Sequence, residues 1–377
     1  YGGITEHRTG QDLLRARRAG TEFVNISPLQ EDIDAQLNAR WLSPRPGTDV
    51  ALMLGIAYVL ATEGLADESF LRSHCVGYPQ VRAYLLGAED GIAKTPAWAA
   101  KISGIDPQQI IALAREMALK RTFITAAWAL QRGDHGEQPF WMVVTLAAML
   151  GQIGLPGGGF GFGYSAEAFI GSDWKRFNWA TVSKGKNPAE LAIPVARIAD
   201  MLLNPGEQVA YDGRDITYPD TKLIYWAGGN PFHHHQDLNR LVSAWRRPDT
   251  VIVNEPWWTP TAQWADIVFP ATTSLERTDI CASSHDPYAH LMEQVIPPQY
   301  EAKSDYEIFA GLAAALGFAD RFTESKSERQ WLQDLWNRSA VFAQQQGFVL
   351  PDFASWEQTK KYKLPDEPRT RDWLADF

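Results

Sequence analysis

The sequence predicts an α/β protein with two domains, each built around a mostly parallel sheet. Residues 222–276 run in the order strand, glycine turn, helix, strand, terminal carboxylate and third strand. Residues 11–27 follow a related order, with a charged helix, a strand and a polar residue at the strand tip. A chain of 377 residues with 45% hydrophobic and 21% charged content can form two sizeable cores.

The stretch that begins at residue 222 carries the clearest signal. Residues 222–226 (KLIYW) are apolar and rich in β-branched and aromatic side chains, which predicts a buried strand. The turn over 227–231 (AGGNP) contains two glycines, which let a ligand approach the backbone closely. A helix, a second strand, its polar tip and a third strand come next, at residues 236–245, 250–253, 254–255 and 265–269.

This order is typical of a nucleotide-binding βαβ unit, in which the glycine turn faces the phosphates. The carboxylate of Glu255, at the tip of the second strand, suits a ribose hydroxyl. The strict GxGxxG motif is absent, which disfavours a nicotinamide-dependent dehydrogenase. A structural α/β turn without a ligand is the alternative that the pattern leaves open.

The N-terminal half is predicted to begin with a helix over 11–18 and a strand over 22–26 that ends at Ser27. Asp49 is predicted as the N-cap of a helix over 50–61. A carboxylate and free amides at that helix start also suit a polar ligand group. Further helices are predicted at 64–86, 108–119, 138–150, 195–203 and 306–316, and a further strand at 122–127.

Two segments between these elements are less regular. The glycine-rich segment 154–164 is predicted as a packed loop, because Phe and Tyr are interleaved with its glycines. The segment 166–192 is weakly patterned, which favours a surface excursion. We place a first domain at 1–205, a second at 206–350 and a tail at 351–377.

Composition and charge exclude several classes of function. The net charge of −10 lacks the basic footprint of a nucleic-acid-binding protein. Cys75 and Cys281 form no CxxC motif, so we expect no iron–sulfur or zinc-ribbon site. The longest apolar run, 141–150, is too short to span a bilayer. The chain begins at Tyr1 without a signal peptide and stops at Phe377 without an evident cap, so we expect a piece of a larger polypeptide.

Three clusters are candidates for chemistry. The histidines at 233–235 are consecutive and cannot easily point at one ion, so no metal site is predicted there. Arg132 follows a strand-end turn, where a guanidinium would bind an oxyanion, and an ion pair with Asp134 or Glu137 is a comparable alternative. The run 276–279 (ERTD) is either a surface ion-pair network or part of the pocket after the third strand.

Five stretches together resemble the central part of the DMSO reductase family of molybdenum enzymes. They are PGTDVALMLGIAYVL, WALQRGDHGEQPFWMVVTLAAMLGQIGLPGGGFGFGY, WAGGNPFHHHQDLNRL, WWTPTAQWADIVFPATTSLERTDI and PPQYEAKSDYEIF, and the match covers most of residues 20–320. The likeness is strongest to DMSO, trimethylamine N-oxide and biotin or methionine sulfoxide reductases. It implies two Rossmann-like domains with mostly parallel sheets, as the central fragment of a four-domain molybdenum enzyme.

The resemblance also implies a cofactor and a reaction. The cofactor is bis(molybdopterin guanine dinucleotide) molybdenum, which takes oxygen from an S-oxide or N-oxide, and two electrons and two protons release that oxygen as water. Residues matched to one guanosine or its pyrophosphate are Ile26, Ser27, Gly47, Thr48 and Asp49, and those near the pterin and substrate funnel are Trp128, Ala129 and Arg132. Residues matched to the other nucleotide are Asn230, His234, Asn254, Glu255, Arg277 and Asp305.

The sequence departs from the family pattern in several places. The serine that ligates molybdenum lies N-terminal to the matched part, and the C-terminal domain that completes the cofactor cradle is missing. Ser27 stands where the family usually has Asp or Asn. We therefore expect this segment alone to be inactive. The family implies an electron donor such as a c-type cytochrome or a small redox protein, and a periplasmic location with a cytoplasmic alternative.

Two rivals to this interpretation remain open at this point. One is a cofactor-free α/β binding or scaffold module that kept the fold, although polar residues at both sets of strand tips disfavour it. The other is a different molybdopterin oxidoreductase of the same family.

Overall fold

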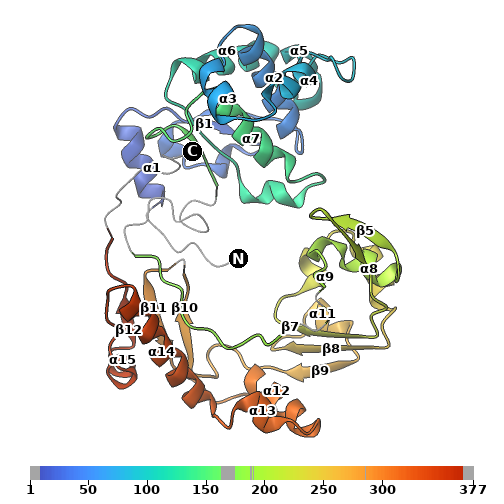
Figure 1. Cartoon of the computed structure of the whole chain (residues 1–377), viewed down its shortest axis with the longest axis vertical. Coiled ribbons are helices and arrows are strands. Elements are labelled where there is room, and N and C mark those ends of the chain that lie inside the picture. Colours follow the sequence, from blue (N-terminus) through green and yellow to red (C-terminus); the bar gives the residue numbers. More distant parts are fainter. Residues whose placement is uncertain (1–8, 163–174, 187–188, 190, 285, 368–377) are drawn as a thin grey trace. The chain divides into compact units, whose positions relative to one another are not determined.

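The structure is a computed structural model that describes residues 9–162, 175–186, 189, 191–284 and 286–367. The chain divides into two compact units (Figure 1). The first comprises Tyr1–Arg176 with Asp366–Phe377, and the second comprises Phe177–Pro365. Each unit combines helices with small sheets, and most strand pairs are parallel, as the sequence predicted for the fold class.

The first unit holds two parallel strand pairs. Strand β1 (Val24–Ile26) pairs with β2 (Arg40–Leu42), and β3 (Phe123–Thr125) pairs with β4 (Gly159–Gly161). Strand β4 corrects the prediction of a loop over 154–164. Gly159 lies so close to the chain at Ile153 that an added Cβ would sit 3.1 Å from the Ile153 Cα, and its φ of +81° favours glycine.

Helices surround α2 in the first unit. Its buried residues, among them Leu52, Ile56 and Leu60, belong to the main core of this unit. An added Cβ on Gly55 would lie 2.6 Å from the Ala99 Cβ, so the glycine lets α2 and α5 approach closely. The helices are α1 (Thr9–Arg18), α2 (Asp49–Thr62), α3 (Glu68–His74), α4 (Tyr78–Leu85), α5 (Pro96–Ser103), α6 (Pro107–Leu119) and α7 (Gln138–Met149), with 3-10 turns η1 (Gln30–Asp32), η2 (Ala35–Leu37) and η3 (Trp128–Arg132).

The start of α2 differs from its prediction. Thr48, and not Asp49, is the N-cap residue, and Asp49 is the first residue of the helix. The Thr48 hydroxyl donates to the carbonyl of Arg45 at 2.6 Å, which takes it away from the helix amides. Among the described residues, no side chain caps this helix start, so its first amides lack a side-chain acceptor.

The second unit is organised by one parallel sheet in the order β7, β8, β9. Strands β7 (Leu223–Ala227), β8 (Thr250–Glu255) and β9 (Ile267–Pro270) match the three predicted strands, with Ala227 beside Asn254 and Asn254 beside Phe269. Helix α10 (Leu238–Trp245) connects β7 to β8 and buries Leu241 and Trp245 in a core that includes Val251 and Val253.

Antiparallel strands complete the second unit. Strand β5 (Gln208–Tyr211) forms a hairpin with β6 (Arg214–Thr217), and β10 (Asp279–Ala282), β11 (Tyr288–Met292) and β12 (Lys361–Lys363) form a second small sheet. The helices are η4 (Val195–Arg197), α8 (Ile198–Leu203), α9 (Pro231–His234), α11 (Pro260–Gln263), α12 (Asp305–Ala315), α13 (Ala319–Thr323), α14 (Glu328–Gln345) and α15 (Phe353–Thr359).

The units meet along the chain at residue 177, ahead of the boundary predicted near residue 205. Aromatic packing gives the physical reason, because Phe177 contacts Phe348 with ring centroids 5.2 Å apart. The predicted tail 351–377 also contributes to the second unit, since Trp356 of α15 stacks on Trp336 of α14 at 3.9 Å. Residues 163–174 of the expected surface excursion lie outside the described residues.

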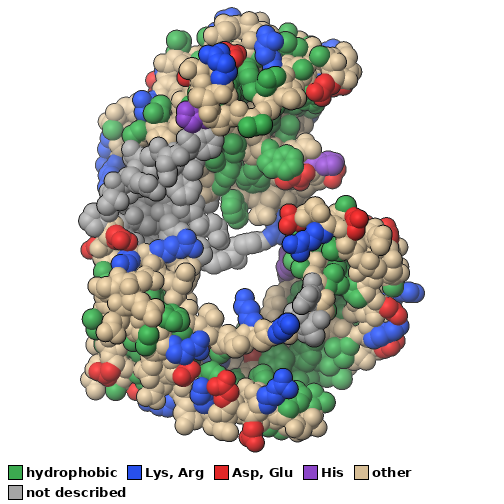
Figure 2. Space-filling view, in the orientation of Figure 1, with side chains coloured by type: hydrophobic (Ala, Val, Ile, Leu, Met, Phe, Trp, Pro, Cys, Tyr) green, Lys and Arg blue, Asp and Glu red, His purple; other side chains and the backbone are tan. Residues whose placement is uncertain are grey.

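Surface charge is mixed on the face that Figure 2 shows. Lys and Arg side chains are interspersed with Asp and Glu over both units, which agrees with the net negative charge of the sequence. In the described part of the chain, no helix has the length and hydropathy that a membrane span requires.

Candidate functional site

Polar residues collect where the three parallel strands of the second unit end. Because parallel strands share a carboxyl edge, the turn after β7, the tip of β8 and the residues after β9 are neighbours. The Ala271–Lys303 bridge extends this edge toward the start of α12. The arrangement follows from sequence, since glycine or polar residues lie at or within two residues of the end of each strand.

The turn after β7 is open to a ligand. Gly228 and Gly229 have φ values of +81° and +82°, in the left-handed region that favours glycine. Among the described atoms, none lies within 4 Å of the position a Cβ would take on Gly228. The turn is held from within, because Trp226 donates to the Gly229 carbonyl at 3.1 Å and Thr261 donates to the side-chain carbonyl of Asn230.

A hydrogen-bond chain joins β7, β8 and α12. The Tyr225 hydroxyl donates to Asn254 Oδ1 at 2.8 Å, and Asn254 Nδ2 donates to Asp305 Oδ1 at 2.9 Å. Asn254 is 4% exposed, whereas Asp305 is exposed at the first position of α12. Burial raises the pKa of the Tyr225 phenol and the nearby Asp305 charge adds to this, against a smaller opposing effect of Asn254, so the phenol stays protonated as a donor.

Glu255 ends β8 and is half-buried. Its carboxylate accepts from the Trp257 amide at 3.4 Å and from the Thr259 hydroxyl at 3.2 Å. Both contacts are long for hydrogen bonds, so the carboxylate keeps capacity for a stronger donor. The following Trp257 and Trp258 are 68% and 71% exposed.

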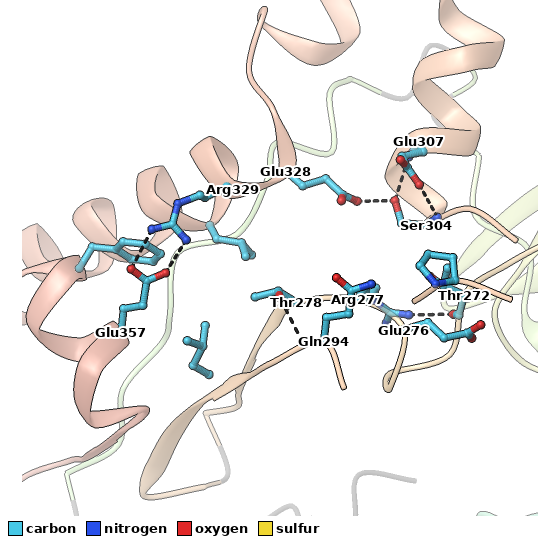
Figure 3. A pocket seen from close by; sticks show the side chains of 14 residues that line it. Thr272, Glu276, Arg277, Thr278, Gln294, Ser304, Glu307, Glu328, Arg329 and Glu357 are labelled. Atoms are coloured by element: carbon cyan, nitrogen blue, oxygen red, sulfur yellow. Dashed lines mark hydrogen bonds and ion pairs between the residues drawn. The ribbon is translucent and has the colours of Figure 1, made fainter. Parts of the chain in front are cut away.

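Arg277 lines a pocket of about 310 Å³ (Figure 3). The other lining residues come from the segment between β9 and β10, from β11 and the residues after it, and from α12, α14 and α15. The Arg277 Nη1 donates to the Thr272 carbonyl at 2.9 Å, and its Nε lies 3.4 Å from Asp279 Oδ2. The Thr272 side chain is buried, and its hydroxyl has no hydrogen-bond partner among the described residues. The pocket therefore presents a guanidinium and an unsatisfied hydroxyl.

Four glutamates also line this pocket, at positions 276, 307, 328 and 357. Glu276 is 6% exposed, and hydrogen bonds from the Thr273 amide and hydroxyl and from the Gln299 amide hold the pKa of its carboxyl below the ordinary value. On the opposite side of Figure 3, Arg329 and Glu357 form a two-bond ion pair, with Nη2 and Oε2 2.8 Å apart. These contacts are internal, so Glu276 and Glu357 organise the pocket walls.

The predicted residues of the first unit lie at two strand ends. Ile26 and Ser27 end β1 beside Leu42 of β2, since the Ser27 amide donates to the Leu42 carbonyl at 3.2 Å. The Ser27 hydroxyl donates to Asp32 and accepts from the Leu29 amide at 3.1 Å. The Ser27 side chain is thus 7% exposed and engaged inside the protein.

The loop after β2 ends at the uncapped start of α2. Gly47, Thr48 and Asp49 lie there, and Gly47 has a φ of +75°. Among the described atoms, none lies within 4 Å of a Cβ placed on Gly47. A glycine turn with open space, followed by helix amides that lack a side-chain acceptor, is suited to an anionic group.

The third predicted group follows β3. Trp128, Ala129 and Arg132 lie on η3, where all three are exposed. The Trp128 ring meets Phe140 edge-on, with centroids 6.0 Å apart. A rigid aromatic wall beside an exposed guanidinium is a suitable lining for a small polar substrate.

Two residues of the second unit carried no predicted role. Tyr225 was predicted only as part of a buried strand, and Thr272 was not singled out, although it lies two residues after the end of β9. His234 is exposed at the end of α9, and its ring stacks on His235 with centroids 5.4 Å apart. In the described part of the chain, no group of three or more His, Cys, Asp or Glu side chains could hold a metal ion.

In mixed α/β folds, ligands commonly bind outside the carboxyl ends of parallel strands, where this chain places its polar groups. The chain belongs to the molybdopterin oxidoreductase family, whose sequence profile matches residues 5–315.

Three curated relatives agree with this assignment. The trimethylamine-N-oxide reductase of Haemophilus influenzae is 44% identical over 384 residues, which cover 98% of this chain and 46% of the relative. The biotin sulfoxide reductase of Cereibacter sphaeroides is 44% identical over 95% of this chain and 48% of its own length. The dimethyl sulfoxide/trimethylamine N-oxide reductase of Cereibacter sphaeroides is 42% identical over 93% of this chain and 44% of its own length.

The chain thus spans about half the length of the curated relatives it matches. Acetylene hydratase from Pelobacter acetylenicus has a similar fold, with a TM-score of 0.60 and 18% identity over 96% of this chain and 50% of that protein. At this identity the likeness concerns the fold alone.

Proposed function

We propose that the complete protein is a molybdenum-dependent reductase of S-oxides or N-oxides. In this proposal the chain supplies two Rossmann-like domains that hold the guanosine arms of bis(molybdopterin guanine dinucleotide). The family match and the names of the relatives support the reaction class. The observation that carries the role of this chain is the polar edge of the β7–β8–β9 sheet, where an open glycine turn adjoins Glu255 and Asp305.

The residues present fit such a cofactor. A guanosine arm carries phosphates, ribose hydroxyls and the N–H groups of guanine. The second unit offers Arg277 for a phosphate, an unpartnered buried Thr272 hydroxyl, and carboxylates at Glu255 and Asp305 for hydroxyl or N–H donors. The open space beside Gly228 admits a ligand against the backbone.

Each residue would act by binding and orienting. Glu255 would accept from a ribose hydroxyl, with Asn230 and His234 flanking the same arm. Asp305 would accept from the purine. In the first unit, the α2 amides and Gly47 would hold the other pyrophosphate, with Thr48 and Asp49 at its edge and the backbone of Ile26 and Ser27 facing that guanosine.

The residues after β3 would serve the substrate. When bound, the cofactor supplies two-electron oxygen transfer from an S-oxide or N-oxide. Arg132 would bind the polarised oxide oxygen, while Trp128 and Ala129 would exclude water from one side. An electron donor such as a c-type cytochrome or a small redox protein, and a periplasmic location with a cytoplasmic alternative, belong to the same proposal.

The direct test uses the complete protein from a host that makes the cofactor. We expect bound molybdenum by elemental analysis, and oxidation of a reduced viologen dye on addition of DMSO, trimethylamine N-oxide or biotin sulfoxide. A protein that holds no molybdenum would refute the proposal. A loaded protein that leaves all three oxides unreduced would refute the substrate class.

A further inference from the structure

The hydrogen-bond chain Tyr225–Asn254–Asp305 begins at Tyr225, a residue outside the proposed nucleotide contacts. Tyr225 lies on β7, Asn254 is the penultimate residue of β8 and Asp305 begins α12, so three separate elements meet in one line of hydrogen bonds. Tyr225 is also fixed by packing, because its ring lies 5.2 Å from that of Phe309, four residues after Asp305 on α12.

The direction of each hydrogen bond in this hydrogen-bond chain follows from which groups can donate and which can only accept. An ionised carboxylate can only accept, so Asn254 must turn its NH₂ group toward Asp305. The Asn254 carbonyl then faces Tyr225, and only a protonated hydroxyl can satisfy it. The Tyr225 hydroxyl therefore selects the orientation in which the Asn254 amide supports the carboxylate.

This support controls how Asp305 is presented. The buried Asn254 amide donates to Oδ1 of Asp305. Oδ2 of Asp305 has no hydrogen-bond partner among the described residues. Asp305 is the first residue of α12, so its carboxylate adjoins the positive end of the helix dipole. The result is a fixed, exposed acceptor rather than a freely rotating side chain.

A fixed carboxylate suits one purine edge. Guanine presents two adjacent donors, N1–H and the 2-amino group, which a carboxylate can accept together. Adenine has an acceptor at N1, which would repel the carboxylate. We infer that Tyr225 is a positioning residue that, through Asn254, holds Asp305 in the orientation that selects guanine, an inference that rests on the proposed binding of a guanosine arm.

The test measures nucleotide selection by the complete protein prepared from a host that lacks the cofactor. Calorimetric titration with GMP, IMP and AMP gives the affinity for each base, and wild-type protein should prefer GMP. Tyr225→Phe removes one hydroxyl and should weaken GMP binding about five- to tenfold. AMP binding should be unchanged, so the GMP/AMP ratio falls by the same factor, with IMP in between.

The matched control is Tyr306→Phe. Tyr306 follows Asp305 directly on α12, but its hydroxyl donates to the Lys326 carbonyl at 2.6 Å, away from the chain of interest. Both variants lose one tyrosine hydroxyl bond in the same region. We expect Tyr306→Phe to keep the GMP/AMP ratio even where it lowers the melting temperature.

A double-mutant cycle separates positioning from general stability. Asn254→Ala breaks the same chain at the next link, and the double variant with Tyr225→Phe should bind GMP no more weakly than Asn254→Ala alone. Additive losses, or an unchanged GMP/AMP ratio in Tyr225→Phe, would overturn the inference while leaving nucleotide binding intact. Wild-type protein that binds none of the nucleotides would instead overturn the proposed function, and this inference with it.

Discussion

Glu255 is the single residue whose loss reports most simply on the strand-tip site. Its two loop contacts, at 3.4 and 3.2 Å, are long, so a ribose hydroxyl would supply its strongest hydrogen bond. Glu255→Ala is expected to weaken cofactor retention by about 1.5–3 kcal/mol. The measurement is molybdenum per chain in the complete protein.

A matched control for this variant is Glu301→Ala, which removes an exposed carboxylate from a loop of the same unit. That variant should keep the wild-type molybdenum content. Full occupancy in Glu255→Ala after dialysis would count against a role for Glu255 in holding the ribose.

Arg132 is expected to affect turnover and not loading. It is exposed on η3 beside Trp128, so Arg132→Ala should remove a charged contact to the oxide oxygen and slow catalysis by about tenfold or more. Steady-state kinetics with molybdenum content measured on the same sample checks this. Loss of the metal, or unchanged kcat/KM, would exclude the assigned role.

At the residue scale, the sequence predicted which residues lie at the strand tips, but it did not predict which side chains they contact. Strand order predicted Asn254 and Glu255 at a polar strand tip, and the family resemblance implied a role for Asp305. The structure brings Asn254 and Asp305 into direct contact. Their partner Tyr225 could not be found, because it sits inside an apolar strand where a tyrosine looks like core. The N-cap assignment of Asp49 was wrong because Thr48 bonds back to Arg45.

At the element scale, close packing of α2 on α5 depends on Gly55. A Cβ there would meet the Ala99 Cβ at 2.6 Å, so Gly55→Ala should force the helices apart and lower the free energy of unfolding by about 1–3 kcal/mol. Gly311 is the control, since it lies in α12 and no described atom lies within 4 Å of an added Cβ. Gly311→Ala should instead stabilise the protein by about 0.5–1 kcal/mol.

Urea denaturation of four proteins checks both predictions: wild type, Gly55→Ala, Gly311→Ala and the double variant. The free energy of unfolding should fall in Gly55→Ala and rise in Gly311→Ala. A stabilising Gly55→Ala would show that α2 and α5 do not pack as described. A destabilising Gly311→Ala would show that this glycine has a packing partner.

Asp200 of α8 forms ion pairs with two arginines, Arg197 immediately before α8 and Arg240 of α10, and the second pair links the two helices. Burial alone would raise the pKa of its carboxyl, but hydrogen bonds from Arg197 and Arg240 outweigh burial and hold the pKa below the ordinary value of 3.8. A lowered folded-state pKa means that the ionised group stabilises the fold above about pH 3.8, and that this contribution is lost as the pH falls through the folded-state pKa.

Asp200→Asn should therefore lower the free energy of unfolding by about 1.5–3 kcal/mol at pH 7. The difference in the free energy of unfolding between wild type and Asp200→Asn should become smaller as the pH drops below 3.8. The exposed Asp220–Lys222 pair, at 2.9 Å, supplies the control, because Asp220→Asn should change stability by less than about 1 kcal/mol. A gap that widens in acid would contradict the assigned ion pairs.

Helices and strands with strong periodicity could be predicted from the sequence, including all three strands of the β7–β9 sheet and the helix between the first two. Strand β4 could not, because Gly159–Gly161 has no apolar alternation and forms a strand only by pairing with β3. The packing of the segment around α15 could not be predicted either, because it depends on Trp356 stacking on Trp336, a contact between two separate helices.

At the scale of the whole molecule, the chain is two units with related strand tips and a family membership that covers residues 5–315. The resemblance carried the reaction class, because neither unit on its own contains a self-sufficient set of catalytic groups among its described residues. The predicted strand order indicated where a ligand would approach the protein. The side-chain types at the strand tips indicated which chemical groups that ligand would carry. The identity of the redox centre came from the family.

The measurement that tests the central claim most directly is the ratio of released guanine nucleotide to molybdenum in the complete, cofactor-loaded protein. Acid hydrolysis followed by chromatography and elemental analysis gives both quantities from one sample. Two guanine nucleotides per molybdenum are expected if both sets of strand tips hold a guanosine arm. Molybdenum without guanine nucleotide would contradict the account.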